Sequence, residues 1–183
     1  MLTEKGKVQA TVVGKRLLNT PIDGIVTSSF QRAIDTGNMI EMQINKPVIG
    51  ALDALVEYEY PSHANGLSYD DDRHKEMVRV VREKFLTHES HSDEETFSEL
   101  QERVRKVLAY LQERSEEHIL VVSHGRFIKF LFSSICWGDS FTPVAFNNVE
   151  HTLKSSNTGI THIELRDDGK WVAWQWNDSA HLG

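Results

Sequence analysis

Cysteine is nearly missing from this sequence, because Cys136 is the only one among its 183 residues. No disulfide can form within the chain, which is typical of proteins in a reducing compartment, so we expect a cytoplasmic location. Cys136 lies in an apolar run over residues 130–137, and a free cysteine in such a run is usually buried. We therefore predict a core position for it.

Long hydrophobic runs are also missing. No stretch approaches the ~20 apolar residues that cross a bilayer, and residues 1–6 have no signal-peptide pattern, so we expect no membrane partner. Positive charge is in short supply as well. The formal net charge of −7 repels a phosphodiester backbone and disfavours nucleic-acid binding, although it allows a local basic pocket for a small anion.

Apolar residues make up 39% of the chain, enough for a folded core, and the length suits one domain with an inserted cap. Thr3 resembles an N-cap and begins a helical stripe that runs to Leu18. The later elements alternate between strand and helix, which predicts an α/β fold: strands at residues 22–29, 47–55 and 119–122, helices at residues 31–43 and 126–135, a long helix after the capping-box pair Thr96 and Glu99, and a terminal hairpin at 159–165 and 171–176. The segment 119–122 is apolar on both faces, which is typical of a central parallel strand.

Residues 58–95 have a different character. They hold three consecutive aspartates, a predicted helix over residues 72–85, and four of the nine histidines, so we interpret them as a cap-like excursion from the core. The histidines raise the hypothesis of a metal-dependent hydrolase. Only His88 and His91 have ligand-like spacing, and no cysteine assists them, so we favour a solvated cap and expect no metal and no cofactor.

Two strand-to-helix junctions carry the residues best suited to chemistry: Thr27-Ser28-Ser29-Phe30-Gln31-Arg32 and Val122-Ser123-His124-Gly125-Arg126. Ligands of open parallel sheets bind beyond the carboxyl ends of the strands, where helix N-termini direct backbone N–H groups at the same space. Arg32 offers a planar fork for phosphate oxygens, and His124 can donate a hydrogen bond. Gly125 allows a close backbone approach, and Ser29 completes the predicted phosphate-binding set. Arg32 alone would suit a solvated surface role, and His124 alone would suit a structural role. The two junctions together favour an anion site.

Glu57 is the third candidate, at the end of the extended segment where the chain leaves the core. A carboxyl group beside a phosphate holds its proton more readily and can give it to a leaving oxygen. Glu59 competes for this role, and either residue alone would be an ordinary surface glutamate.

The chain resembles the histidine phosphatase superfamily, also called phosphoglycerate-mutase-like. The resemblance spans nearly the whole chain, in the family's order, and its motifs are specific only in combination: Leu2-Thr3-Glu4-Lys5-Gly6, Ser28-Ser29-Phe30-Gln31-Arg32-Ala33, Leu55-Val56-Glu57, Glu95-Thr96-Phe97, Val121-Val122-Ser123-His124-Gly125 and the tail Asn177-Asp178-Ser179-Ala180-His181-Leu182. It implies a three-layer α/β/α fold over residues 1–183 with a mostly parallel sheet. It also implies a phosphohistidine mechanism on a small phosphorylated metabolite, with Arg32 and His124 clamping the phosphate and Glu57 as the acid.

One family motif is missing. The family's nucleophile lies in an Arg-His-Gly motif that ends a central strand before the Leu-Thr-Glu-Lys-Gly helix, and no Arg-His-Gly occurs here. We expect a truncated phosphomonoester phosphatase that is inactive as given, because removing the nucleophile removes the covalent pathway. The alternatives are a non-catalytic phosphate-ligand or protein-binding module and a phosphoglycerate-type mutase. A missing strand would leave apolar faces and unpaired backbone groups, so we also expect a homodimer that covers them.

Overall fold

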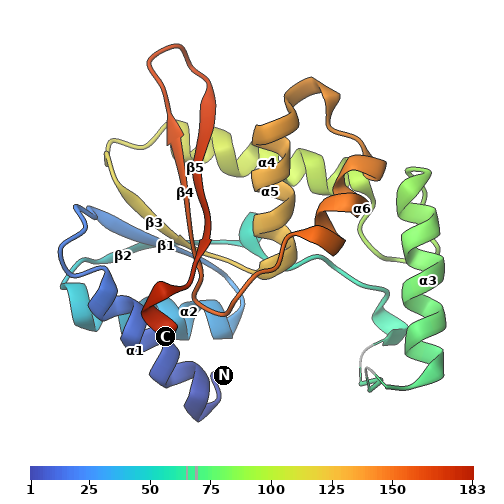
Figure 1. Ribbon diagram of the computed structural model, residues 1–183, viewed down its shortest axis with the longest axis horizontal. Helices are drawn as coiled ribbons and strands as arrows, with labels where there is room; N and C mark the ends of the chain where they lie inside the picture. Colours follow the sequence, from blue (N-terminus) through green and yellow to red (C-terminus); the bar gives the residue numbers. More distant parts are fainter. Residues whose placement is uncertain (65, 69) are drawn as a thin grey trace.

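The centre of the fold is a parallel sheet, which has three strands in the described residues (Figure 1). β1 (Gly24–Ser28) lies in the middle, between β2 (Val48–Leu52) and β3 (Ile119–Val122), and Val26 of β1 pairs with Val121 of β3. The computed structural model describes residues 1–64, 66–68 and 70–183, so positions 65 and 69 of the predicted excursion lie outside the described residues.

Helices cover both faces of this sheet. Successive strand residues point to opposite faces, and Ile25 and Val26 of β1 accordingly belong to different hydrophobic clusters. Ile25 packs with α1 (Glu4–Arg16) and α2 (Gln31–Ile44), which lie together below the sheet in Figure 1. Val26 packs with buried residues of α4 (Phe97–Gln112) and α5 (Gly125–Trp137). The predicted three-layer α/β/α architecture is confirmed.

The prediction that residues 119–122 form a central strand is wrong for the described part of the chain. β3 is an outer strand of its sheet and only half-buried, whereas every residue of β1 is buried. The apolar character of β3 has another cause. Leu120 and Val122 pack on the α1–α2 side and Ile119 and Val121 on the α4–α5 side, so both faces are covered without a flanking strand on each edge.

Helix starts follow the capping chemistry of the sequence. The Thr3 hydroxyl accepts from the Gly6 N–H, and Thr96 and Glu99 form the predicted capping box. The sequence analysis missed α6 (Pro143–Thr152), although Thr142 caps it and proline fills its first position, which is a recognisable start signal.

The predicted excursion contains one long helix, α3 (Asp72–Leu86), and the short turn η2 (Ser62–Ala64). Figure 1 shows α3 at the end of the molecule farthest from the sheet. Its buried face nevertheless shares the main hydrophobic cluster, where Phe85 lies 5.6 Å from Phe97 and 5.9 Å from Phe146 between ring centroids. The excursion is therefore packed onto the core through aromatic contacts.

The predicted hairpin forms a separate antiparallel pair, β4 (Ile160–Leu165) and β5 (Trp171–Asp178), which projects beyond the central sheet in Figure 1. Gly169 supplies the left-handed backbone of its turn, with φ of 78°. No helix in the described ranges is long and apolar enough to span a bilayer.

The prediction of a buried cysteine is wrong, because Cys136 is exposed. The core face of α5 is formed by Phe127, Phe130 and Leu131. Cys136 lies about 140° around the helix from Leu131, so it points away from that face. The apolar run in the sequence is longer than the stripe that the helix buries.

Candidate functional site

The two predicted anion-binding side chains lie in contact. The Nε of Arg32, in the first turn of α2, donates to Nδ1 of His124 across 3.1 Å. On the other side of the imidazole, Nε2 lies 2.8 Å from the Ser28 hydroxyl at the end of β1. Because Nδ1 accepts from Arg32, the ring carries its proton on Nε2 and donates it to Ser28. The parallel pairing of β1 and β3 produces this meeting, since both strands end at the same edge.

His124 is neutral in this arrangement. It is 6% exposed, and burial lowers the pKa of its imidazole to about 4, with the neighbouring Arg32 charge acting in the same direction. Glu57 opposes this by raising the pKa of His124, but by less. The ring is therefore a fixed hydrogen-bonding group, not a second cation, until an anion arrives.

Phe30 borders both residues. Its ring centroid lies 5.2 Å from the Arg32 guanidinium carbon and 5.3 Å from the His124 ring in an edge-on arrangement. The Phe30 N–H donates to the Ser28 hydroxyl, so the same residue fixes the network through its backbone. Phe30 remains 38% exposed, which places an aromatic surface at the mouth of the site.

The two helix N-termini differ. No side chain caps α2, and in the described residues the N–H groups of Gln31 and Arg32 make no hydrogen bond. At α5, the Glu57 carboxylate accepts from the N–H groups of Arg126 and Phe127 at 3.3 and 3.1 Å. The expectation of free N–H groups therefore holds for α2 and is wrong for these two groups of α5, because a carboxylate caps them.

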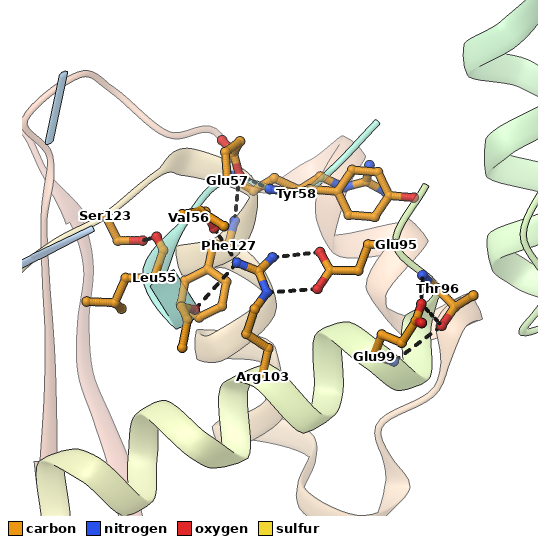
Figure 2. Close-up of polar contacts among 12 residues, drawn as sticks. Leu55, Val56, Glu57, Tyr58, Glu95, Thr96, Glu99, Arg103, Ser123 and Phe127 are labelled. Atoms are coloured by element: carbon orange, nitrogen blue, oxygen red, sulfur yellow. Dashed lines mark hydrogen bonds and ion pairs between the residues drawn. The ribbon is translucent and has the colours of Figure 1, made fainter. Parts of the chain in front are cut away.

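A buried ion pair holds the segment that carries Glu57 (Figure 2). Arg103 of α4 forms two hydrogen bonds with Glu95, at 2.7 and 2.6 Å, and donates to the Val56 carbonyl at 2.5 Å. Ser123, just before His124, donates to the Leu55 carbonyl at 2.7 Å. Burial raises the pKa of Glu95, although Arg103 opposes that shift. The backbone before Glu57 is thus fixed by donors from two other elements.

Arg126, in the first turn of α5, lies among charged and aromatic partners. Its Nε is 2.8 Å and its Nη2 is 3.2 Å from the two Glu150 oxygens of α6. Its guanidinium carbon lies 3.7 Å from the Tyr58 ring centroid and 5.4 Å from that of Tyr60. Burial disfavours the charge, but the surrounding tyrosines and carboxylates outweigh it, so the net pKa of Arg126 is raised.

The remaining predicted residues lie at the same edge. Ser29 is half-buried and its N–H donates to the Leu52 carbonyl at the end of β2. Gly125 begins α5, where a Cβ atom would lie 3.2 Å from the Ser155 hydroxyl, so glycine lets Ser155 lie close to the backbone.

Sequence analysis missed Ser28, Phe30, Arg103, Arg126 and Glu150 as site residues. Ser28, Phe30 and Arg126 were within the quoted motifs, whereas Glu150 gave no local signal.

The excursion histidines do not assemble a metal site in the part of the chain that the structure describes. No group of three or more His, Cys, Asp or Glu side chains is arranged there to hold an ion. The His63 and His91 rings lie 6.2 Å apart, and His88 lies 3.4 Å from the Ser98 hydroxyl. The metal-dependent hypothesis therefore gains no support from the described residues.

Comparison with known protein families matches residues 1–179 to the histidine phosphatase superfamily, branch 1. The chain belongs to the histidine phosphatase superfamily. A probable phosphatase of Schizosaccharomyces pombe, C1687.21, is 28% identical, and the match covers 99% of this chain and 83% of that protein. The uncharacterized phosphatase PhoE of Bacillus subtilis is 26% identical with the same two coverages.

Solved structures also share the fold of this chain. Bacillus stearothermophilus YhfR superposes with a TM-score of 0.82 at 23% identity, over 100% of this chain and 87% of that one. A mycobacterial glucosyl-3-phosphoglycerate phosphatase, solved with inorganic phosphate, gives a TM-score of 0.76 at 20% identity, over 100% of this chain and 89% of that one. These likenesses establish the phosphoglycerate-mutase-like fold that the sequence motifs imply.

Proposed function

We propose that this histidine phosphatase binds a phosphomonoester of a small metabolite, with the phosphate held by Arg32 and His124, and hydrolyses it only in a chain that also contains the family's Arg-His-Gly motif. The observation that carries the proposal is the 3.1 Å contact between these side chains. Arg32 uses its Nε for His124, and its two Nη groups donate no hydrogen bond to any described residue. These two groups therefore form a fork that can bind phosphate oxygens. The N–H groups that begin α2 add partial positive charge beside that fork.

In this proposal, Ser29 and Gly125 complete the phosphate pocket and Glu57 is the acid. Glu57 lies next to His124 in the electrostatic network and at the start of α5, where an incoming phosphate would compete for the same N–H groups. A phosphate would favour the protonated carboxyl group, which could then donate its proton to the leaving oxygen. The phosphatases among the relatives and neighbours support the substrate class, including a phosphoserine phosphatase from Entamoeba histolytica.

The covalent step needs a nucleophile that these 183 residues do not supply in the family's motif, since they contain no Arg-His-Gly. We therefore expect the 183-residue chain to bind phosphate without hydrolysing esters. Steady release of phosphate from p-nitrophenyl phosphate by this chain would contradict that expectation.

The test is phosphate binding measured by isothermal titration calorimetry, with inorganic phosphate and vanadate as probes. Arg32→Ala should weaken binding at least tenfold because it removes the free Nη donors, and His124→Ala should do so because it removes the ring that fixes Arg32 through its Nε. Arg166→Ala and His151→Ala are matched controls, since both side chains are exposed and lie outside the site. Unchanged affinity in Arg32→Ala and His124→Ala would remove the proposed site.

A non-catalytic binding module is the second candidate, favoured by the missing Arg-His-Gly motif. It predicts that binding of phosphate or a phosphopeptide depends on Arg32. It also predicts that, in a chain extended to contain the motif, Glu57→Gln does not change the rate of phosphate release. A hydrolase predicts that the same substitution lowers turnover in the extended chain.

The outer edge of β3 bears on assembly. Within the described ranges, β3 pairs with β1 alone, and an open strand edge can pair with another chain. We propose that two copies associate there. Light scattering at micromolar concentration should then report a dimer, and a monomer would contradict the assembly.

A cytoplasmic location without a cofactor remains our expectation, based on the single cysteine and the donor set of the site.

A further inference from the structure

Ser28 is the last residue of β1, and its side chain is 0% exposed. It lies two positions after Val26, so its hydroxyl points to the face of the sheet that α4 and α5 cover. His124 begins α5 on that face, and its ring meets the hydroxyl there. Because β1 is paired on both sides, by β2 and β3, the Ser28 oxygen is carried by a firmly held part of the fold.

The Ser28 oxygen accepts two hydrogen bonds. His124 donates to it from Nε2 across 2.8 Å, and the Phe30 N–H donates to it across 3.2 Å. Arg32, two positions after Phe30, donates to the other ring nitrogen across 3.1 Å. The four residues therefore form a closed ring of contacts. One oxygen holds both the start of the helix that carries Arg32 and the imidazole that Arg32 contacts.

The two contacts of the imidazole differ in the protonation states that allow them. Arg32 can donate only to a bare Nδ1, so its contact requires the neutral ring. Ser28 can accept from Nε2–H in the neutral ring and in the charged ring alike. An anion that favours the charged imidazole would break the contact with Arg32 and keep the contact with Ser28. Ser28 is thus the partner that holds the ring in both states.

We propose that Ser28 is a positioning residue, whose hydroxyl fixes the His124 ring and thereby holds Arg32 with its Nη groups directed to phosphate. The part that concerns phosphate rests on the proposed function, whereas the fixing of Arg32 does not. Removing the hydroxyl leaves a buried Nε2–H without its acceptor. The ring can then rotate or move its proton to Nδ1, and either change ends the contact with Arg32.

The experiment follows one proton of Arg32 and the affinity for phosphate in Ser28→Ala. In the 183-residue chain without phosphate, NMR should show the Arg32 Nε proton exchanging with solvent about threefold faster or more. The Nε proton of Arg103, which donates to Glu95 at 2.7 Å, should keep its rate and serves as the internal reference. Calorimetry should show that inorganic phosphate binds about threefold to tenfold more weakly.

Ser133→Ala is the matched control. Ser133 is also 0% exposed, and its hydroxyl donates to the Lys129 carbonyl within α5, so both measurements should stay unchanged. A further measurement needs no variant. Nitrogen-15 shifts of the His124 ring in the unmodified chain at neutral pH should show a protonated Nε2 and a bare Nδ1. A bare Nε2 would overturn the proposal, because Ser28 would then be the donor.

The outcomes separate this proposal from the proposed function. Unchanged exchange of the Arg32 proton in a folded Ser28→Ala variant would overturn the positioning role, even if the affinity for phosphate fell, because the effect would not act through Arg32. Faster exchange with unchanged affinity would overturn the link between positioning and phosphate. Failure of the unmodified chain to bind phosphate would overturn the proposed function, while the exchange rate would still test whether Ser28 fixes Arg32.

Discussion

Arg32 donates from Nε to Nδ1 of His124 across 3.1 Å, joining two side chains that are 92 positions apart in the sequence. The bond fixes the imidazole tautomer and leaves the forked end of the guanidinium for an anion. The bond requires the neutral form of His124, because a protonated Nδ1 could not accept from Arg32. We therefore expect the protonation of His124 to be linked to the binding of an anion in the site.

The first prediction concerns that linkage. In a proton NMR titration, the His124 ring should titrate with a midpoint near pH 4, because burial and Arg32 lower its pKa. Saturating phosphate should raise the midpoint, since a bound anion favours the charged imidazole. A midpoint at or above the usual 6.5 without phosphate would contradict the burial of a neutral ring.

The same shift predicts how stability depends on pH. The unfolded chain protonates His124 near pH 6.5, whereas the folded chain does so near pH 4, so the unfolded state binds more protons between these values. The free energy of unfolding should fall as pH drops through this window, by an amount on the order of 3 kcal/mol from this group. Urea unfolding of the natural chain and of His124→Gln should differ in slope over pH 4–6.5. Identical slopes would remove the prediction.

Phe30 should influence phosphate affinity without touching the phosphate. Its ring contacts Arg32 and the edge of His124, so Phe30→Ala should free both side chains and weaken phosphate binding about threefold to tenfold. Phe30→Leu keeps apolar bulk but not the ring, so its phosphate affinity should lie between those of the natural chain and of Phe30→Ala. Met42→Ala, at the far end of the same helix and 80% exposed, should leave affinity unchanged. Equal affinity in all three would show that the ring has no positioning role.

The Arg103–Glu95 pair should behave as a buried salt bridge. Arg103→Met leaves the Glu95 carboxylate without its partner and removes the donor to the Val56 carbonyl, so we expect a loss of about 3–5 kcal/mol in the free energy of unfolding. The double variant Arg103→Met with Glu95→Leu should recover part of that loss, because no charge is left buried. Denaturant titration measures both, and a double variant no more stable than the single one would contradict the explanation.

Glu57→Gln should weaken the start of α5. The carboxylate accepts from two N–H groups there, and its charge lies at the positive end of the helix, so we expect a loss of about 1 kcal/mol in the free energy of unfolding. Glu59→Gln is the matched control, since Glu59 is exposed two residues later. Equal stability of the two variants would show that Glu57 does not cap the helix.

The sequence predicted the core elements apart from α6, and it predicted the meeting of Arg32 with His124, because these depend on local signals. Caps such as Thr3 and Thr96 and the strand-end position of each junction are visible in short windows. It did not predict that Glu57 caps α5 or that Glu150 pairs with Arg126, since these contacts join residues 70 and 24 positions apart with no spacing rule. The outer position of β3 was missed because two-sided burial by helices resembles a central strand.

Arg103 holds the approach to Glu57 through the carbonyl oxygens of Ala54 and Val56, not through their side chains. Every amino acid carries that oxygen, so the anchor does not depend on which residue stands at either position. Substitutions there that fit the core should therefore accumulate during divergence while the carboxylate keeps its place. A related chain can thus differ along this segment and still present the same acid, provided that the arginine and its glutamate remain.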